Sequence, residues 1–185
     1  SSRINEYSAK KQYNGADILK LLQAKAPKDA YCTIGCTMTD LYPQESWNFV
    51  FGLATIETGV GVFSFARYDE NFFVDNPETV TDPKLIIYRA SKVMAHEIGH
   101  MFGIKHCIFF RCLMNGSNNL EENNTKPMEF CPICLRKLQS NIGFDIAKRY
   151  RGMQACFEEL GGEFKADISW YKKALALSKT EQSDQ

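Results

Sequence analysis

The segment His96-Glu97-Ile98-Gly99-His100-Met101-Phe102-Gly103-Ile104-Lys105-His106 contains all three histidines of the chain. It has the pattern HExxHxxGxxH, in which three imidazoles and one carboxylate fall within eleven residues. Neutral imidazole is a common ligand of zinc and other transition metals, so this segment predicts a metal site.

The spacing predicts the geometry of that site. Side chains four residues apart lie above one another on a helix, so His96 and His100 can bind one ion at about 2.0–2.1 Å each. Glu97 projects to one side, where it can reach a metal-bound water without binding the metal. Gly103 permits a left-handed backbone that ends the helix and returns His106 to the same ion. A fourth coordination position stays open for water.

The chemistry expected of such a site is hydrolysis. Zinc lowers the pKa of its bound water to about 7, which provides a nucleophile at neutral pH. Glu97 would act as general base and later pass the proton to the leaving amine, while zinc polarises the scissile carbonyl. Imidazole also suits copper, iron and nickel, so the three histidines alone leave the metal open.

Four cysteines predict a second metal site. The pattern Cys107-x4-Cys112 is followed downstream by Cys131-x2-Cys134, the spacing of a four-cysteine zinc site. Thiolates at about 2.3 Å fill all four positions of a tetrahedral zinc, so such a site is closed and structural. It would tie the loop after His106 to the first C-terminal helix.

Two other interpretations of these cysteines stay open. Cys131 and Cys134 could be a thioredoxin-like redox pair, although no βαβ pattern surrounds them, and the four could form two disulfides in an exported protein. The odd total of seven cysteines and their tight pairs favour thiolate ligands in a reducing compartment. We expect the other three to be small buried side chains: Cys32, Cys36 and Cys156.

Composition limits the class of protein. The 185 residues suit one globular domain, and 22 basic residues balance 22 acidic ones. No basic cluster indicates nucleic-acid binding, and no apolar run approaches membrane-spanning length. Residues 1–7 are polar and lack the apolar core of a signal peptide. The chain opens on Ser1, so the earlier loss of a signal peptide stays open. From the cysteine usage we expect a protein inside the cell, in the cytoplasm or also in the nucleus. We also expect a monomer.

Apolar periodicity predicts an α+β arrangement. Strands are expected at 31–38, 47–54 and 59–66, with a hairpin link at 55–58, and a loop at 69–84. Helices are expected at 17–25, 91–102, 146–160 and from 164. The prediction is one domain, 1–185, with a mixed-sheet upper half up to about residue 103 that carries the histidine helix. The lower half, from about 104 to 185, would be helical and held by the cysteine site.

The His/Cys combination HEIGHMFGIKHC…CLM…CPIC, together with segments 36–43 and 63–67, resembles the archaemetzincin family of metzincin metallopeptidases. The resemblance implies a metzincin-like zincin fold and two zinc ions. It implies a catalytic ion on His96, His100 and His106 with Glu97 as base, and a structural ion on Cys107, Cys112, Cys131 and Cys134. It also makes Met114 the hydrophobic floor beneath the histidines, and the Asn-Gly sequence that follows it favours a turn.

The same resemblance predicts how substrate binds. A peptide would run antiparallel along an edge strand of the upper sheet, held by backbone hydrogen bonds. We assign this edge to residues 59–66 and a pocket wall to residues 115–120.

The leading functional hypothesis is therefore a zinc metallopeptidase that acts on small or unfolded peptides. The alternative is a zinc-stabilised binding module with little or no catalysis. Such a module would have no use for a general base at Glu97. A third hypothesis, a zinc hydrolase of non-peptide bonds, fits the extended motif less well.

Overall fold

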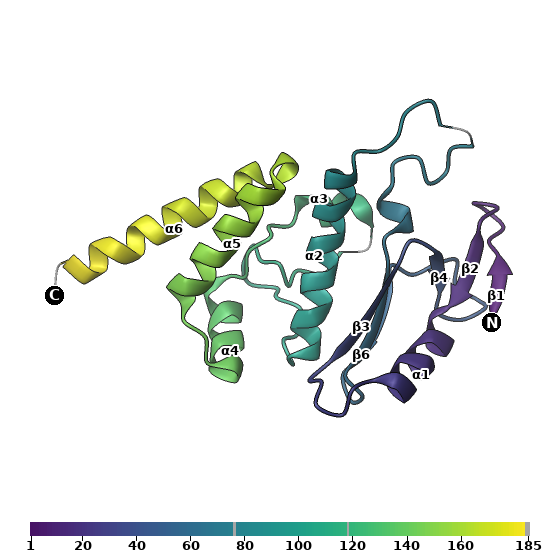
Figure 1. The fold of residues 1–185 in the computed structure, drawn as a ribbon, viewed down its shortest axis with the longest axis horizontal. Coiled ribbons are helices and arrows are strands. Elements are labelled where there is room, and N and C mark those ends of the chain that lie inside the picture. Colours follow the sequence, from purple (N-terminus) through teal and green to yellow (C-terminus); the bar gives the residue numbers. More distant parts are fainter. Residues whose placement is uncertain (76, 118, 184–185) are drawn as a thin grey trace. The chain divides into compact units, whose positions relative to one another are not determined.

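The computed structural model describes residues 1–75, 77–117 and 119–183. Its backbone contacts divide the chain into two units. The first, here the sheet unit, comprises Ser1–Asp82 and Val93–Gly103, and the second, here the helical unit, comprises Pro83–Lys92 and the chain from Ile104 onward. Helix α2 (Pro83–Met101) contributes residues to both (Figure 1).

The sheet unit contains all six strands that the structure describes. Its elements are β1 (Ser2–Ile4), β2 (Lys11–Asn14), α1 (Gly15–Lys25), β3 (Thr33–Thr37), β4 (Asp40–Tyr42), β5 (Gly52–Thr55), β6 (Val60–Ser64) and the 3-10 turn η1 (Ala66–Tyr68). Asn14 caps α1 through its side chain, which accepts a hydrogen bond from the Asp17 backbone N–H at 3.1 Å. The strands form two three-stranded sheets with the orders β1-β2-β4 and β3-β6-β5.

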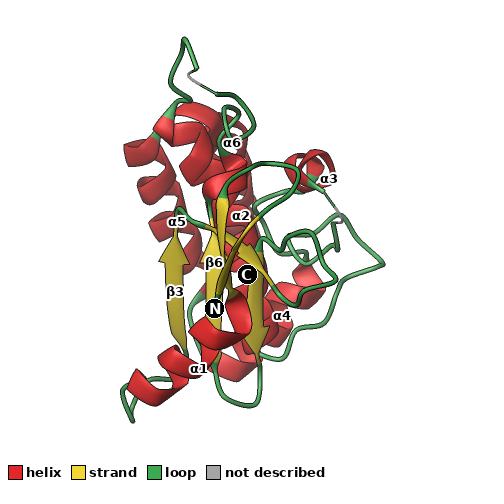
Figure 2. Cartoon of the chain, turned by 90° about the vertical axis from the view of Figure 1, so that its right-hand side faces the viewer, coloured by secondary structure: helices red, strands yellow, loops and turns green. Residues whose placement is uncertain are grey.

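The sheet β3-β6-β5 has a helix on each face. In it β3 runs parallel to β6, and β5 runs antiparallel to β6 across the predicted hairpin (Figure 2). Leu22 of α1 lies against Gly35 on one face. On the other face the second half of α2 approaches, where Met94 Sδ lies 3.9 Å from Cys36 Sγ and Phe102 stacks on Tyr31. The histidine helix is thereby held against the sheet.

One strand assignment is wrong. Residues 59–66 were expected to form an exposed edge, but β6 lies between β3 and β5 and all five of its residues are buried. The run Val-Gly-Val-Phe-Ser lacks the polar alternation of an exposed strand, as is usual for a strand covered on both faces. In the described part of the chain, the strands with a free edge in this sheet are β3 and β5.

The small N-terminal sheet was not predicted. A buried ion pair fixes it, because two guanidinium nitrogens of Arg67, Nε and Nη2, donate to the Asp40 carboxylate at 2.8 and 2.7 Å. Gln12 donates to the same carboxylate at 2.8 Å, and the Arg67 guanidinium also lies 3.7 Å from the Phe49 ring centroid. These contacts join β2 and β4 to η1. The strands have only three or four residues each, too few for a periodic signal.

The helical unit is built around an aromatic core. Its elements are the first half of α2, α3 (Leu120–Thr125), α4 (Pro132–Ile142), α5 (Ile146–Leu160), the 3-10 turn η2 (Gly162–Phe164) and α6 (Lys165–Ser183). Phe157 of α5 stacks on Phe164 at 4.5 Å, and Tyr171 of α6 and Met128 complete the buried cluster. Figure 1 shows α5 and α6 side by side. The two predicted C-terminal helices and the break at Gly161 are confirmed.

Two helix predictions were incomplete. Helix α2 begins at Pro83 rather than at residue 91, with proline in the first turn, where its missing N–H costs nothing. The consecutive apolar residues 85–88 hid the helical period. Helix α3 was missed because its six residues form only about one and a half turns, too few for a periodic apolar pattern. Among the described helices, none is both long and apolar enough to cross a membrane.

Candidate active site and metal centres

The segment 96–106 brings its three imidazoles together. The ring nitrogens of His96, His100 and His106 that could bind a metal all lie within 4.8 Å of one another. The Nε2 atoms of His96 and His100 are 3.0 Å apart. Two ligands at about 2.05 Å on a tetrahedral ion would be about 3.3 Å apart, so this donor set fits zinc. His96 is buried and His106 is exposed, which leaves one side of the group accessible.

Gly103 makes the return of His106 possible. Its φ angle is +80°, in the left-handed region, and its N–H bonds the carbonyl of His100 at 2.8 Å. A residue with a side chain rarely adopts this conformation, whereas glycine does so freely. The predicted helix end is confirmed, and three residues later the imidazole of His106 lies beside the other two.

Glu97 lies next to His96 on α2 and is only partly exposed. The buried hydroxyl of Tyr68 faces it within the sheet unit. Burial raises the pKa of Tyr68, and the negative carboxylate of Glu97 raises that pKa further. Tyr68 therefore remains a neutral phenol beside the carboxylate across the physiological pH range.

Met114 lies in the turn expected of it. Its side chain is fully buried, and its carbonyl accepts a hydrogen bond from the Cys107 N–H at 2.9 Å. The turn continues to Gly116, where an added Cβ would meet the His106 ring at 3.5 Å. The turn thus packs directly against the third histidine. The role of Met114 as a floor for the whole group stays a prediction.

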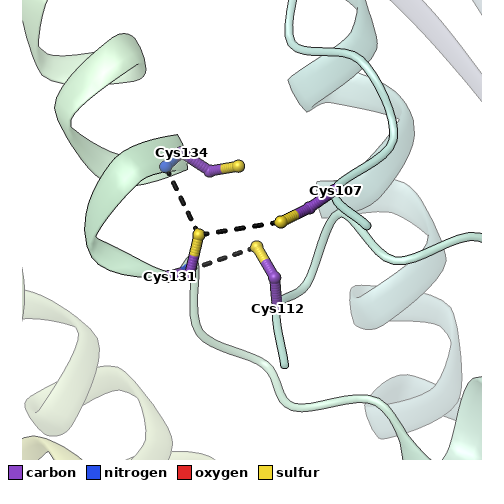
Figure 3. Close-up of side chains that lie close together, drawn as sticks. All are labelled: Cys107, Cys112, Cys131 and Cys134. Atoms are coloured by element: carbon purple, nitrogen blue, oxygen red, sulfur yellow. Dashed lines mark hydrogen bonds between the residues drawn. The ribbon is translucent and has the colours of Figure 1, made fainter. Parts of the chain in front are cut away.

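The four cysteines of the second motif also converge. The Sγ atoms of Cys107, Cys112, Cys131 and Cys134 all lie within 4.8 Å of one another, and all four residues are buried (Figure 3). Cys107 Sγ and Cys131 Sγ are 3.9 Å apart. This separation excludes a disulfide, which needs about 2.05 Å, and matches the roughly 3.8 Å between thiolates on one tetrahedral zinc.

Backbone N–H groups point at these sulfurs. Cys112 Sγ accepts from the N–H of Met114 at 3.4 Å and of Cys131 at 3.2 Å, and Cys131 Sγ accepts from that of Cys134 at 3.5 Å. The last bond also caps α4. Such donors stabilise negative sulfur, so the donor set fits zinc held by thiolates.

The thiols differ in electrostatic environment. Burial raises the pKa of both Cys112 and Cys134. Burial acts in the same direction on Cys107 and is the largest single influence. Hydrogen bonds to its sulfur, from the backbone of Phe109 and Phe110 and from the side chains of Cys131 and Cys134, together outweigh burial and lower that pKa. A bound cation would favour the thiolate form of all four.

Asn115 braces the loop that carries the first two cysteines, a role that sequence analysis missed. Its amide nitrogen donates to the carbonyls of Cys107 at 2.6 Å and Phe110 at 2.9 Å. Its amide oxygen accepts from the Cys112 N–H at 2.8 Å. The Asn-Gly pair signalled a turn, but not the three contacts that hold the loop closed.

The remaining cysteines were only partly predicted. Cys36 and Cys156 are exposed and Cys32 is half-buried, so the prediction that they are buried is wrong. Cys36 does lie on the predicted face of β3, but that face is incompletely covered at its position. All seven cysteines lie in the described part of the chain and are free.

The predicted pocket wall is described in part. Residue 118 lies outside the described residues. Asn115 and Gly116 border a cavity of about 410 Å³ together with side chains of α3. A substrate-binding role for this wall stays a prediction.

Comparison with protein families identifies the chain. The model of peptidase family M54 matches residues 6–140, a range that contains both ligand groups. The chain belongs to peptidase family M54. The resemblance to archaemetzincins is thereby confirmed.

Relatives in this family include mammalian proteins. The chain is 44% identical to mouse archaemetzincin-2 over an alignment 174 positions long, which covers 83% of the chain and 48% of that protein. It is 36% identical to human archaemetzincin-1, with 82% of the chain and 35% of that protein covered. The chain thus spans about half the length of the curated relatives it matches, or less.

Solved structures of similar proteins share the fold. A zinc-dependent peptidase from Methanocorpusculum labreanum has a TM-score of 0.58 and 31% identity, covering 69% of this chain and 74% of that one. The archaemetzincin of Methanopyrus kandleri has a TM-score of 0.56 and 34% identity, covering 72% of this chain and 67% of that one. The predicted α+β zincin fold is confirmed.

Proposed function

We propose that the chain is a zinc metallopeptidase that hydrolyses peptide bonds. The observation that carries this proposal is the three-imidazole group with Glu97 next to it on α2, in a chain of family M54. A structural zinc site has no use for an unligated carboxylate at that position. The name of the Methanocorpusculum relative, a zinc-dependent peptidase, supports the same chemistry.

His96, His100 and His106 would hold the catalytic ion. When bound there, zinc would act as a Lewis acid. It would lower the pKa of water, so that the water is easily deprotonated to a nucleophile, and it would stabilise the negative charge that develops on the carbonyl oxygen. Glu97 would accept the proton from the attacking water and deliver it to the nitrogen of the departing peptide. Tyr68, as a neutral phenol beside Glu97, would help to keep that carboxylate in place.

Cys107, Cys112, Cys131 and Cys134 would hold a second, structural zinc. Their burial and mutual distances support a closed site without room for water. Such an ion would join the loop after His106 to the start of α4. Two zinc ions per chain is therefore part of the proposal.

The substrate would be a small or unfolded peptide. An extended peptide can extend the β3-β6-β5 sheet only at β3 or β5, the strands with a free edge among the described residues. The predicted monomeric state and the predicted cytoplasmic or nuclear location stay predictions.

The test is digestion of a diverse peptide library by zinc-loaded protein, with fragments identified by mass spectrometry. Glu97→Gln keeps the size of the side chain but removes the base, so cleavage should fall by about a hundredfold or more. Metal analysis should still find two zinc ions per chain. Glu57→Gln, in the exposed turn before β6, is the matched control and should cleave normally.

Two results would contradict the proposal. Unchanged cleavage by Glu97→Gln would show that this carboxylate is not the base. No cleavage by either protein, with both zinc ions present, would favour the zinc-stabilised binding module.

A further inference from the structure

The cavity of about 410 Å³ beside the turn after Met114 starts next to the third histidine. Gly116 lines it, and an added Cβ on Gly116 would meet the His106 ring at 3.5 Å. An extended peptide spans about 3.3–3.6 Å per residue, so a group one or two residues from a bond cleaved at an ion on His106 can reach the cavity. The described residues that line it all belong, like His106, to the helical unit: Arg111, Asn115, Gly116, Glu122, Thr125 and Lys126.

The lining of this cavity carries more positive than negative charge. Arg111 and Lys126 contribute two cations, and Glu122 contributes one carboxylate. The sequence from Gly99 to Leu120, which contains His106, includes Lys105 and Arg111 but no Asp or Glu. A concave surface with an excess of one sign of charge raises the local concentration of groups of the opposite sign, so this cavity favours an anion.

Arg111 has hydrogen-bond donors available for that anion. Its side chain is exposed, and Nη2 donates to the Thr125 carbonyl at 3.0 Å. Within the described parts of the chain this is its only hydrogen bond, and it forms no ion pair there. A guanidinium has five N–H donors in a planar fork, which matches the two oxygens of a carboxylate. The bond to Thr125 therefore orients the group and leaves four donors for a ligand.

The neutral polar side chain of the lining is already committed. The amide of Asn115 donates to the carbonyls of Cys107 and Phe110 and accepts from the Cys112 N–H. These three bonds hold the loop closed, so the amide is not offered to a ligand. Recognition in this cavity therefore depends on its charged groups.

A second cavity shares part of this wall but suits an anion less well. Arg111 and Lys126 also border a cavity of about 650 Å³ in the helical unit, which is lined in addition by Lys92, Glu129 and Asp167. An anion there would meet two carboxyl groups, both buried. The smaller cavity contains one carboxylate and lies beside His106, so it is the better place for an anionic group of a substrate.

We propose that the smaller cavity binds a carboxylate of the peptide substrate through Arg111, which makes Arg111 a specificity-determining residue. The carboxylate would come from an Asp or Glu side chain or from the free C-terminus of a short peptide. The inference rests on the proposed peptidase function, because it names the class of peptide that the same site prefers. Its test has one arm that needs no turnover.

The test uses four series of octapeptides that differ in one varied position. The acid series has Asp or Glu there, the amide series Asn or Gln, and the amine series Lys, and all three are N-acetylated and C-amidated. The fourth series repeats the amide sequences with a free C-terminal carboxylate. Comparison of the first and fourth series distinguishes the two sources of the carboxylate.

The binding arm uses immobilised, zinc-loaded Glu97→Gln protein, and the retained peptides are quantified by mass spectrometry. The acid series or the free C-terminus series should be retained at least about tenfold better than the amide series. The cleavage arm uses the zinc-loaded parent protein and the same peptides, and kcat/KM should follow the same order. Preferential retention without any cleavage would keep the anion site and refute the peptidase.

Variants of Arg111 assign the preference to this residue. Arg111→Gln should reduce it about tenfold or more in both arms without changing the amide series. Arg111→Glu should reverse it in favour of the amine series, and Arg111→Lys should keep part of it, because the charge remains but the fork is lost. Arg151→Gln, at an exposed arginine on α5, is the charge-matched control and should behave like the parent. Zinc content and melting temperature show that each variant is folded.

Three results would overturn the proposal. Equal retention and cleavage of the acid, amide and free C-terminus series would show that the cavity does not recognise a carboxylate. A preference that folded Arg111→Gln retains would place the carboxylate elsewhere. An equal loss in Arg151→Gln would attribute the preference to the overall charge of the protein rather than to this cavity.

Discussion

Gly103 links the two halves of the histidine motif through a single backbone angle. Its φ of +80° turns the chain from α2 toward His106, and an added Cβ would meet no atom within 4 Å. Conformation rather than space therefore makes glycine the favoured residue here. Gly143, at the end of α4, has the same conformation and the same free space, but lies outside the motif.

Gly103→Ala should destabilise the protein by about 1 kcal/mol, the cost of a left-handed alanine. It should also weaken zinc binding at the histidines, because the turn would relax away from His106. Chemical denaturation and metal titration measure the two effects. Gly143→Ala should cost similar stability but leave zinc affinity unchanged, and equal zinc affinity in the two variants would contradict this account.

Asp167 provides a prediction for pH dependence. Burial raises its pKa, while Lys92 opposes the shift and Glu129 and Tyr88 are its other neighbours. The folded protein thus holds a proton that the unfolded chain releases near pH 4, so this group makes stability fall as pH rises through that window. Asp167→Asn removes the effect.

At pH 8, Asp167→Asn should therefore have a free energy of unfolding about 1 kcal/mol or more above that of the parent. The advantage should vanish below pH 4, where the parent carboxyl is protonated in both states. Urea unfolding across pH measures this. A variant less stable than the parent at pH 8 would show that the Asp167 charge is compensated.

The loop from Cys107 to Gly116 depends on one side chain more than on its own backbone. Asn115 makes three hydrogen bonds across it, and the exposed apolar residues Ile108 and Phe109 at its tip add little packing. The loop presents two of the four sulfurs and carries the turn beside His106.

Asn115→Ala should destabilise the protein by about 1–3 kcal/mol, because it leaves backbone groups of the loop without partners. Zinc should also leave the cysteine site faster, measured by transfer to a chromogenic chelator. Asn119→Ala, which removes only the cap of α3, is the matched control and should release zinc at the parental rate. Parental zinc release by Asn115→Ala would mean that the metal alone holds the loop.

For the chain as a whole, the helical unit should depend on the cysteine site. Its aromatic core lies around α5 and α6, whereas the chain from Ile104 to Phe130 has only the short α3 as regular structure among its described residues. A structural zinc contributes binding energy directly to folding.

Cys107→Ser should therefore lose one of two zinc ions and lower the melting temperature measured by calorimetry. Cys156→Ser, at an exposed cysteine outside the site, should keep both ions and the parental melting temperature. One zinc in the parent would refute the two-site proposal, and a parental melting temperature for Cys107→Ser would refute the structural role.

The sequence by itself determined the features that depend on neighbouring residues. Helical spacing placed His96 over His100, and Gly103 turned the chain just after the end of α2. The apolar periodicity of α5 and α6 extended over enough residues to predict both helices. The convergence of the four cysteines also followed from their spacing, because a tetrahedral thiolate site has few ways to form.

Tertiary structure alone decided which surfaces are covered and which distant groups meet. It placed β6 at the centre of its sheet, left Cys36 exposed, and paired Asp40 with Arg67. It also brought Lys92, Glu129 and Asp167 around one cavity from separate parts of the chain. Local periodicity carries no information on such contacts, because strand order and burial depend on how the elements pack.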